Sequence, residues 1–231
     1  MSAIFKVMTY NTRGSLGIDN LRSTERIAET VRLHSPDIVC FQEIHQRLPW
    51  SRLENQPKRL GHLLECPFYF HSPVNFGLGR YGIGIASRWK PTHIRKYLLP
   101  SQGEQRGLLE LEFLDVATIG SFRVFCTHWG LKPEERARQG RYCVEKVGGS
   151  SLPVVFCGDL NEDAAAEGVR GLLEQAGLSD FNLQGTLTFP SDAPNTRIDY
   201  ILGCGLTCNR FEVVGSLASD HLPLLADIRI S

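Results

Sequence analysis

Short apolar runs recur along the whole chain, and most are bounded by glycine, proline or charged residues. Such runs are typical of β-strands, because a strand crosses a small core in a few residues and then needs a turn. The 22 glycines and 12 prolines also favour many short elements. We expect strands over residues 4–10, 37–41, 81–89, 93–99, 107–114, 122–127, 153–157, 197–202, 206–214 and 224–230.

Helical spacing of apolar residues appears between these runs. Ser23 is a candidate N-cap, and Pro36 ends the first of these patterns. Pro133 suits the first turn of another helix. The remainder of residues 50–80 is expected to be irregular. The four expected helices cover residues 23–33, 52–64, 133–146 and 164–175.

A strand, a helix and further strands follow one another twice along the chain. The best layered arrangement for this order is two packed sheets with helices outside. The links between the runs at 93–99, 107–114 and 122–127 are short, which favours antiparallel neighbours. With 42% hydrophobic and 22% charged residues, the composition is that of an ordinary globular protein. We expect one domain over residues 1–231.

The charges balance, with 25 Lys and Arg against 25 Asp and Glu. No global positive field attracts nucleic acid, so any contact with a polyanion must come from a local patch. A modest basic stretch is one candidate, and a solvated strand face is the ordinary alternative. This stretch holds Arg80, Arg88, Lys90, Arg95 and Lys96.

The seven cysteines do not suggest a disulfide framework, since the count is odd and three lie in apolar runs. Cys40, Cys126 and Cys157 are typical of small buried hydrophobic residues. Cys204 and Cys208 are four residues apart but lack the further ligands that structural zinc needs. The N-terminus lacks the features of a signal peptide, and no apolar run approaches ~18 residues. We expect no transmembrane segment and a cytoplasmic location.

Polar residues gather where the predicted strands end. Each has an ordinary explanation alone, as a turn former, a solvated charge or a helix cap. An Asp within the apolar run RIDYI is harder to explain, since its burial is costly without a partner. Together, these oxygen-rich residues suit a hard divalent cation such as Mg²⁺ or Mn²⁺. They are Asn11, Glu43, His128, Asp159, Asn161, Asp199, Asp220 and His221.

Six short motifs carry a family resemblance: MTYN at 8–11, QE at 42–43, TH at 127–128, GDLN at 158–161, RIDYI at 197–201 and SDH at 219–221. In this order they resemble the endonuclease/exonuclease/phosphatase superfamily, the fold of pancreatic deoxyribonuclease. One motif alone would be a weak signal, but six in order span nearly the whole chain. The resemblance implies an α/β (α+β) four-layered sandwich of two packed, mostly antiparallel β-sheets flanked by helices.

The resemblance also implies roles for the residues on the metal side of a site. Glu43 matches the main metal ligand, with Asn11 beside it and Asp220 contributing. Asp159 matches the residue that orients or deprotonates the attacking water, and Asn161 the residue that holds the phosphate or the water.

The remaining matches concern the phosphate. His221 resembles the phosphate-facing histidine, with Asp199 as its carboxylate partner, and His128 resembles a second phosphate-binding histidine. Arg106 is a looser match to a phosphate-contacting arginine. A carboxylate bonded to one nitrogen of His221 would fix its tautomer and favour its protonated form.

The sequence therefore predicts a Mg²⁺- or Mn²⁺-dependent phosphoester hydrolase, a nuclease or phosphodiesterase or a phosphatase, that uses in-line attack of water. Nucleic acid and a small molecule or lipid headgroup compete as substrate. The alternative is a non-catalytic phosphate-binding module on the same fold. We expect a monomer. Trp50, Phe76 and Trp129 could line a substrate pocket or pack in the core.

Overall fold

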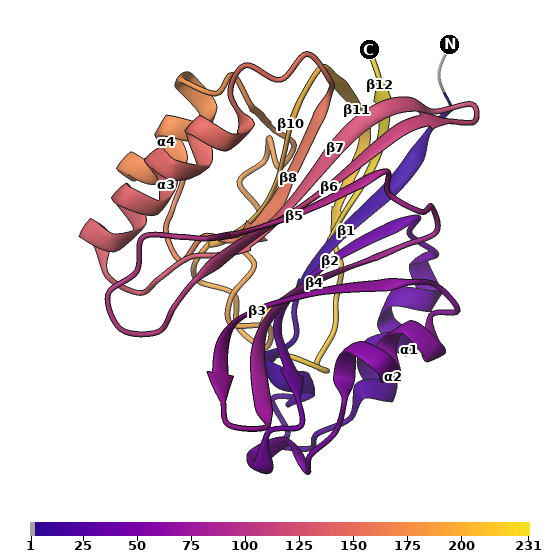
Figure 1. The fold of residues 1–231 in the computed structure, drawn as a ribbon, viewed down its shortest axis with the longest axis vertical. Helices are drawn as coiled ribbons and strands as arrows, with labels where there is room; N and C mark the ends of the chain where they lie inside the picture. The colour runs from indigo at the N-terminus through magenta and orange to yellow at the C-terminus, as the bar shows by residue number, and fades with distance from the viewer. Residues whose placement is uncertain (1–2) are drawn as a thin grey trace.

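The computed structural model describes residues 3–231, which form two six-stranded sheets packed face to face with helices outside (Figure 1). This confirms the expected four-layered sandwich. The first sheet holds β1 (Phe5–Asn11), β2 (Ile38–Gln46), β3 (Phe68–Phe76), β4 (Gly79–Ser87), β11 (Leu206–Val213) and β12 (Leu224–Ile230). The second holds β5 (His93–Leu98), β6 (Gly107–Val116), β7 (Gly120–His128), β8 (Val154–Asp159), β9 (Ser179–Asp180) and β10 (Asp199–Cys204).

The sheets are mixed but mostly antiparallel. Their strand orders are β11-β12-β1-β2-β4-β3 and β5-β6-β7-β8-β10-β9. Each sheet contains one parallel pair, β1 with β2 and β7 with β8. The carboxyl ends of these four strands therefore lie at the same edge of their sheets, where ligand sites form on a rigid scaffold.

The four predicted helices are present, with two on each outer face of the sandwich (Figure 1). They are α1 (Thr24–His34), α2 (Gln56–Leu63), α3 (Pro133–Val147) and α4 (Glu167–Glu174). The Ser23 side chain accepts a hydrogen bond from the backbone N–H of Arg26 at 3.3 Å, which confirms the predicted N-cap. Two short 3-10 helices, η1 (Arg13–Ser15) and η2 (Pro49–Ser51), follow β1 and β2.

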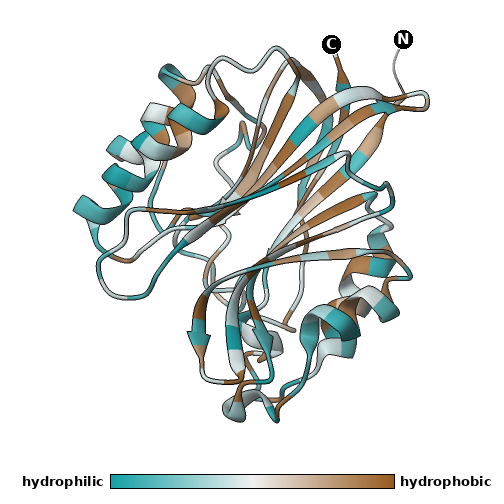
Figure 2. Ribbon diagram, viewed as in Figure 1, coloured by the Kyte–Doolittle hydropathy of each residue, from teal (hydrophilic) through white to brown (hydrophobic). Residues whose placement is uncertain are grey.

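Inner strands such as β1, β2 and β8 bury both of their faces, whereas the edge strands β5 and β11 are partly exposed. Figure 2 shows hydrophobic residues along the strands. In β1, Phe5 and Val7 point into the core between the sheets, whereas Met8 and Tyr10 pack under α1. This alternation follows from the two-residue repeat of a strand. Cys40, Cys126 and Cys157 are free and fully buried in the core between the sheets, as predicted.

The expectation that residues 50–80 are irregular outside their helix is wrong, because β3 pairs with β4 along the sheet edge. The apolar alternation in this strand is interrupted at His71, Ser72 and Pro73. The register shifts between His71 and Val74, and this irregularity accommodates a proline that cannot donate to the ladder. The two-residue strand β9 was also not predicted. Among residues 3–231, the structure contains no helix long and apolar enough to cross a membrane.

Candidate active site

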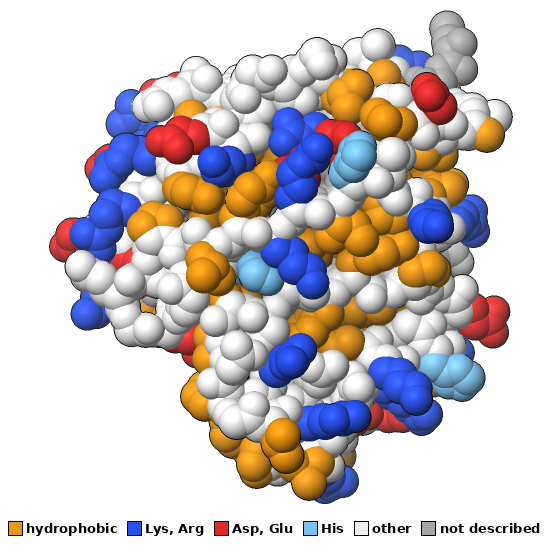
Figure 3. Space-filling model, in the orientation of Figure 1, with side chains coloured by type: hydrophobic (Ala, Val, Ile, Leu, Met, Phe, Trp, Pro, Cys, Tyr) orange, Lys and Arg blue, Asp and Glu red, His pale blue; other side chains and the backbone are white. Residues whose placement is uncertain are grey.

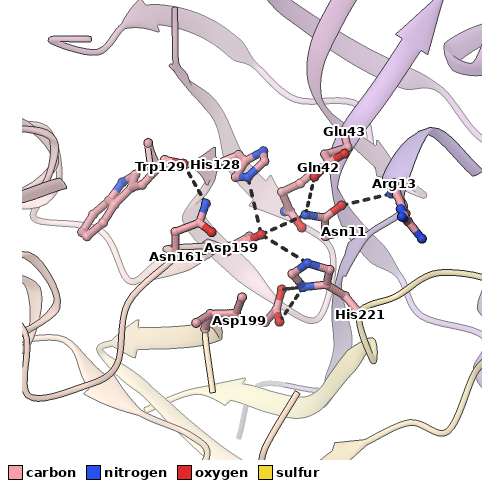
Figure 4. Close-up of polar contacts among 12 residues, drawn as sticks. Asn11, Arg13, Gln42, Glu43, His128, Trp129, Asp159, Asn161, Asp199 and His221 are labelled. Atoms are coloured by element: carbon pink, nitrogen blue, oxygen red, sulfur yellow. Dashed lines mark hydrogen bonds and ion pairs between the residues drawn. The ribbon is translucent and has the colours of Figure 1, made fainter. Parts of the chain in front are cut away.

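Strand register brings the predicted site residues of the second sheet together. His128 at the end of β7 pairs with Asp159 at the end of β8, and Asp159 pairs with Asp199 at the start of β10. Asn11 ends β1 of the first sheet, and His221 lies in the loop before β12. Figure 4 shows these side chains converging from both sheets on Asp159.

An irregularity in β2 positions Glu43. The β2–β4 register shifts between Phe41 and Ile44, and Glu43 adopts a left-handed conformation with φ of 58°. This conformation costs a non-glycine residue about 1 kcal/mol or more. The Thr12 hydroxyl donates to the backbone oxygen of Gln42 at 3.1 Å and helps to hold the turn. The bulge turns Glu43 out of the regular strand alternation and toward Asn11.

Asn11 connects the carboxylates of the two sheets. Its Nδ2 donates to Glu43 Oε1 at 3.1 Å and to Asp159 Oδ2 at 2.8 Å. Its Oδ1 accepts from the backbone N–H of Arg13 at 3.1 Å. The amide therefore presents its NH₂ group to both carboxylates, and it fixes their separation.

Asp159 is the buried centre of the arrangement. Its Oδ1 accepts from the backbone N–H of Asn161 at 2.9 Å, and its Oδ2 lies 3.5 Å from His128 Nε2 and 3.7 Å from His221 Nε2. Burial raises the pKa of Asp159, and the charge of Asp199 adds to the rise, so that the pKa reaches about 7 although His221 opposes it. Such a carboxylate can exchange a proton near neutral pH.

His221 is held in its charged form by a second carboxylate. Its Nδ1 lies 3.0 and 3.1 Å from the two oxygens of Asp199, and the Thr188 hydroxyl donates to Asp199 Oδ2 at 2.6 Å. Burial alone would lower the pKa of His221, but Asp199 and Asp159 outweigh it and raise the pKa to about 10. The ring therefore donates Nδ1–H to Asp199 and faces Asp159 with Nε2–H.

His128, unlike His221, is held in its neutral form. Burial lowers the pKa of His128 well below its ordinary value, and the charges of Arg106 and His221 lower it further. Arg106 Nη1 lies 3.0 Å from His128 Nδ1 and can only donate. This contact assigns the neutral tautomer with its proton on Nε2, which faces Asp159. Arg106 Nε is buried without a hydrogen-bond partner among residues 3–231.

The acidic residues around Asn11 form a donor set that fits a divalent cation. Burial raises the pKa of Glu43, and Asp220 raises it further despite the Asn11 amide. Asp220 Oδ2 lies 3.3 Å from Arg13 Nε, so one of its oxygens shares an arginine. The carboxylates Glu43, Asp159, Asp199 and Asp220 outnumber the nearby cations, and a divalent ion would supply the missing positive charge.

A second group of possible ligands, Asp159, Asp199 and His221, offers ligand atoms within 4.8 Å of one another. A histidine can ligate a metal ion only when its imidazole is neutral. His221 is protonated and uses Nδ1 for Asp199, so a hydrogen-bonded triad explains these contacts better than a metal site.

Some residues of the site were not predicted from the sequence. Thr188 supports Asp199 from a loop with no local pattern, and the Phe189 ring lies 4.7 Å from the His221 ring. Arg13 carries a weak signal, since it follows Asn11 by two residues. Trp129 is fully buried against the helices of the second sheet, so of the two roles considered for it packing is correct. Its backbone oxygen accepts from Asn161 Nδ2 at 2.9 Å.

Comparison with known protein families confirms the family resemblance that the order of the motifs predicts. The sequence model of the Endonuclease/Exonuclease/phosphatase family matches residues 8–221. The chain belongs to this family. No curated protein matches its sequence.

Solved structures of the family share the fold of this member. A protein from Bacteroides vulgatus has a TM-score of 0.83 at 20% identity, with 99% of this chain and 100% of that chain covered. A mannosyl-6-phosphatase from Bacteroides thetaiotaomicron has a TM-score of 0.78 at 20% identity, with 97% and 99% covered. The human Nocturnin catalytic domain with bound sulfate has a TM-score of 0.78 at 19% identity, with 100% and 96% covered.

Proposed function

We propose that this protein is a divalent-metal-dependent phosphoester hydrolase that activates water at Asp159. One observation carries the proposal. A single buried carboxylate faces a charged His221, a neutral His128 and the amide of Asn11, which come from both sheets. Because phosphoesters are anions that resist anionic attack, a site must combine hydrogen-bond donors for the phosphoryl oxygens with a base for the nucleophile.

The side chains divide this work. Asp159 accepts a proton from the attacking water and holds it within the buried site. The Nε2 atoms of His221 and His128 lie 3.7 and 3.5 Å from Asp159 Oδ2, and their N–H groups can bind phosphoryl oxygens. Asn161, whose amide is fixed by the Trp129 backbone oxygen, orients the water or the phosphate. Arg106 supports His128 and adds positive charge behind it.

A divalent cation, Mg²⁺ or Mn²⁺, would be held by Glu43, with Asn11 and Asp220 beside it. When bound, such an ion neutralises phosphate charge and stabilises the leaving oxygen. Asn11 Nδ2 donates to both Glu43 and Asp159, so the ion-binding carboxylate and the base are held in a fixed relation. Arg13 Nε lies 3.3 Å from Asp220 Oδ2 and orients this carboxylate.

Hydrolysis of bis(p-nitrophenyl) phosphate tests the proposal. We expect turnover with Mg²⁺ or Mn²⁺, loss of turnover in EDTA, and recovery when the metal is returned. His221→Gln removes the charged donor and should reduce turnover roughly 10²–10³-fold. Glu174→Gln changes an exposed carboxylate on α4 and serves as the matched control, with wild-type rates expected.

Two outcomes would contradict the proposal. Wild-type rates in purified His221→Gln would remove the role assigned to this histidine. Binding of metal and phosphate with no hydrolysis of any phosphoester would instead identify a non-catalytic phosphate-binding module.

A further inference from the structure

The arginines on the segments that follow β1 and β2 differ in their ion pairing from most other arginines of the chain. Most arginines of this electrically neutral chain form ion pairs, including Arg95, Arg123, Arg136, Arg141, Arg170, Arg197 and Arg210. Among residues 3–231, four arginines on the segments after β1 and β2 and at the start of β4 have none: Arg22, Arg47, Arg52 and Arg80. The other unpaired arginines, Arg32, Arg138 and Arg229, lie on three separate elements.

Two of these arginines line a hollow of about 540 Å³ together with Trp50. Arg22 and Arg52 are close enough for the charge of Arg52 to lower the pKa of Arg22, in addition to the larger effect of burial. Arg26 also lines the hollow, but Asp19 neutralises it at 2.8 Å. Two unpaired guanidinium groups in one hollow create a local site for an anion, which the bulk charge does not provide.

Glu54 is the acidic residue that offsets Arg22. Its charge raises the pKa of Arg22, but the carboxylate is engaged by the Thr24 hydroxyl at 2.8 Å and forms no ion pair with Arg22. The guanidinium of Arg22 instead donates to the backbone oxygen of Gly14. This contact anchors one end of the group, which has no carboxylate in direct contact among residues 3–231.

An aromatic platform adjoins the hollow. Trp50 is 55% exposed and Phe76 is 49% exposed, and they are the aromatic members of the exposed large hydrophobic residues among residues 3–231. Their rings pack edge to face at 5.5 Å, and Trp50 also lies 6.4 Å from His45. Trp50 is thus held by neighbours while much of its surface faces solvent. Figure 3 shows hydrophobic and basic side chains side by side at the lower end of the molecule, where Figure 1 places the β3–β4 hairpin.

The hollow is tied rigidly to the active site through η1. Arg13 pairs with Asp220 at the site, and the next residue, Gly14, accepts from Arg22 at the hollow. Gly14 has a φ of 56°, and a Cβ there would lie 2.2 Å from the His45 ring. The turn therefore requires glycine, and its close packing fixes the arginines relative to the catalytic carboxylates.

We propose that this hollow binds nucleotides adjacent to the reacting phosphate of a single-stranded nucleic acid. The assignment rests on the proposed phosphoester hydrolysis. Arg22 and Arg52 would contact backbone phosphates, and Trp50 would stack a base, the combination by which proteins bind single strands. The flat surface of a lipid bilayer fits this site less well than a nucleic acid strand does. Arg22 and Arg52 line a hollow, whereas contact with a flat surface needs side chains that protrude.

Fluorescence anisotropy with a labelled single-stranded DNA 12-mer tests the assignment. All proteins would carry Asp159→Asn and contain Mg²⁺, so that the strand stays intact and binding is read without turnover. We expect Trp50→Ala to weaken binding about tenfold. Arg52→Gln should weaken it several-fold and reduce the slope of log Kd against log salt by about 0.7. Arg210→Gln, which changes an ion-paired arginine on β11, should bind as the parent does.

The possible results distinguish failure of the nucleic-acid-binding proposal from failure of the proposed hydrolytic function. Unchanged DNA binding in both Trp50→Ala and Arg52→Gln would overturn the assignment, whatever the wild-type protein does to bis(p-nitrophenyl) phosphate. Trp50-dependent binding to vesicles of anionic phospholipid, without binding to DNA, would also overturn it. Inactive wild-type protein that still shows the expected DNA-binding losses would instead refute the hydrolytic function.

Discussion

Two clusters of buried carboxylates in this protein differ in how their charge is balanced. On the second sheet, fully buried Glu110 accepts from Arg95 at 2.7 Å, from Arg123 at 3.0 Å and from the Tyr97 hydroxyl at 2.8 Å. At the active site, Glu43 and Asp159 share one neutral amide, and burial raises the pKa of both.

The difference separates a stabilising cluster from a functional one. Arg95 and Arg123 balance Glu110 and its neighbour Glu112, which lies 3.2 Å from Arg95 Nη1, and hydrogen bonds reach both oxygens of Glu110. The site keeps uncompensated negative charge, which destabilises the fold but suits a proton acceptor and a cation. Removing a carboxylate should therefore cost stability in the first cluster and activity in the second.

The largest effect is expected from Asp159→Asn. The substitution keeps the shape of the side chain but removes the proton acceptor, so turnover should fall roughly 10²–10⁴-fold. Because the carboxylate is buried with a raised pKa, the free energy of unfolding should stay constant or increase. Parallel measurements of kcat and of chemical unfolding check both statements, and a strongly destabilised variant would contradict the comparison.

Glu110→Gln should give the opposite pattern. Loss of the negative charge leaves Arg123 without its buried partner and Arg95 with Glu112 alone, and the free energy of unfolding should fall by about 3 kcal/mol. The active site is formed by other residues, so kcat on bis(p-nitrophenyl) phosphate should not change. A variant that loses turnover while it remains folded would show that the two clusters are not independent.

His45 extends the comparison of the two clusters to a buried side chain that stays neutral, and the His45→Gln variant tests this case. Burial, aided by Arg22, lowers the pKa of His45 to about 4, and its Nδ1 has no hydrogen-bond partner among residues 3–231. Because the folded state resists protonation, the stability from this group is complete above pH 6.5 and is lost as the pH falls toward 4. Between pH 7.5 and 5 the loss amounts to about 2 kcal/mol.

The His45→Gln variant should not show this loss of unfolding free energy at acidic pH. Unfolding in denaturant at several pH values measures it, and His93→Gln on exposed β5 should retain the wild-type dependence. Equal pH dependence in wild type and His45→Gln would show that protonation of His45 does not oppose folding.

Strand ends were the part of the site that sequence alone could predict. A buried apolar run followed by a polar residue locates Asn11, Asp159 and His128 at the carboxyl ends of parallel strands, and the register then brings them together. Ser23 was likewise predictable, because capping depends on neighbours within a few residues. The roles of these residues came from motif order, and they remain proposals.

Contacts between distant segments could not be predicted. Thr188 reaches Asp199 from an irregular loop, and Arg22 meets Arg52 through two loops that carry no periodic pattern. The basic stretch of the sequence also does not form one patch. Arg88 pairs with Asp37, and Arg95 pairs with Glu110, whereas Arg80 forms no ion pair within residues 3–231. Side-chain pairing of this kind depends on tertiary packing rather than on spacing along the chain.

Calorimetric titration of Mn²⁺ into the wild-type protein and into Glu43→Gln tests the central claim most directly. If the unbalanced negative charge of the site holds a divalent cation, the wild type binds Mn²⁺ and Glu43→Gln binds it at least about tenfold more weakly. Glu110→Gln, the matched change in the balanced cluster, should bind like the wild type. Equal affinity in wild type and Glu43→Gln, or no binding by the wild type, would contradict the account.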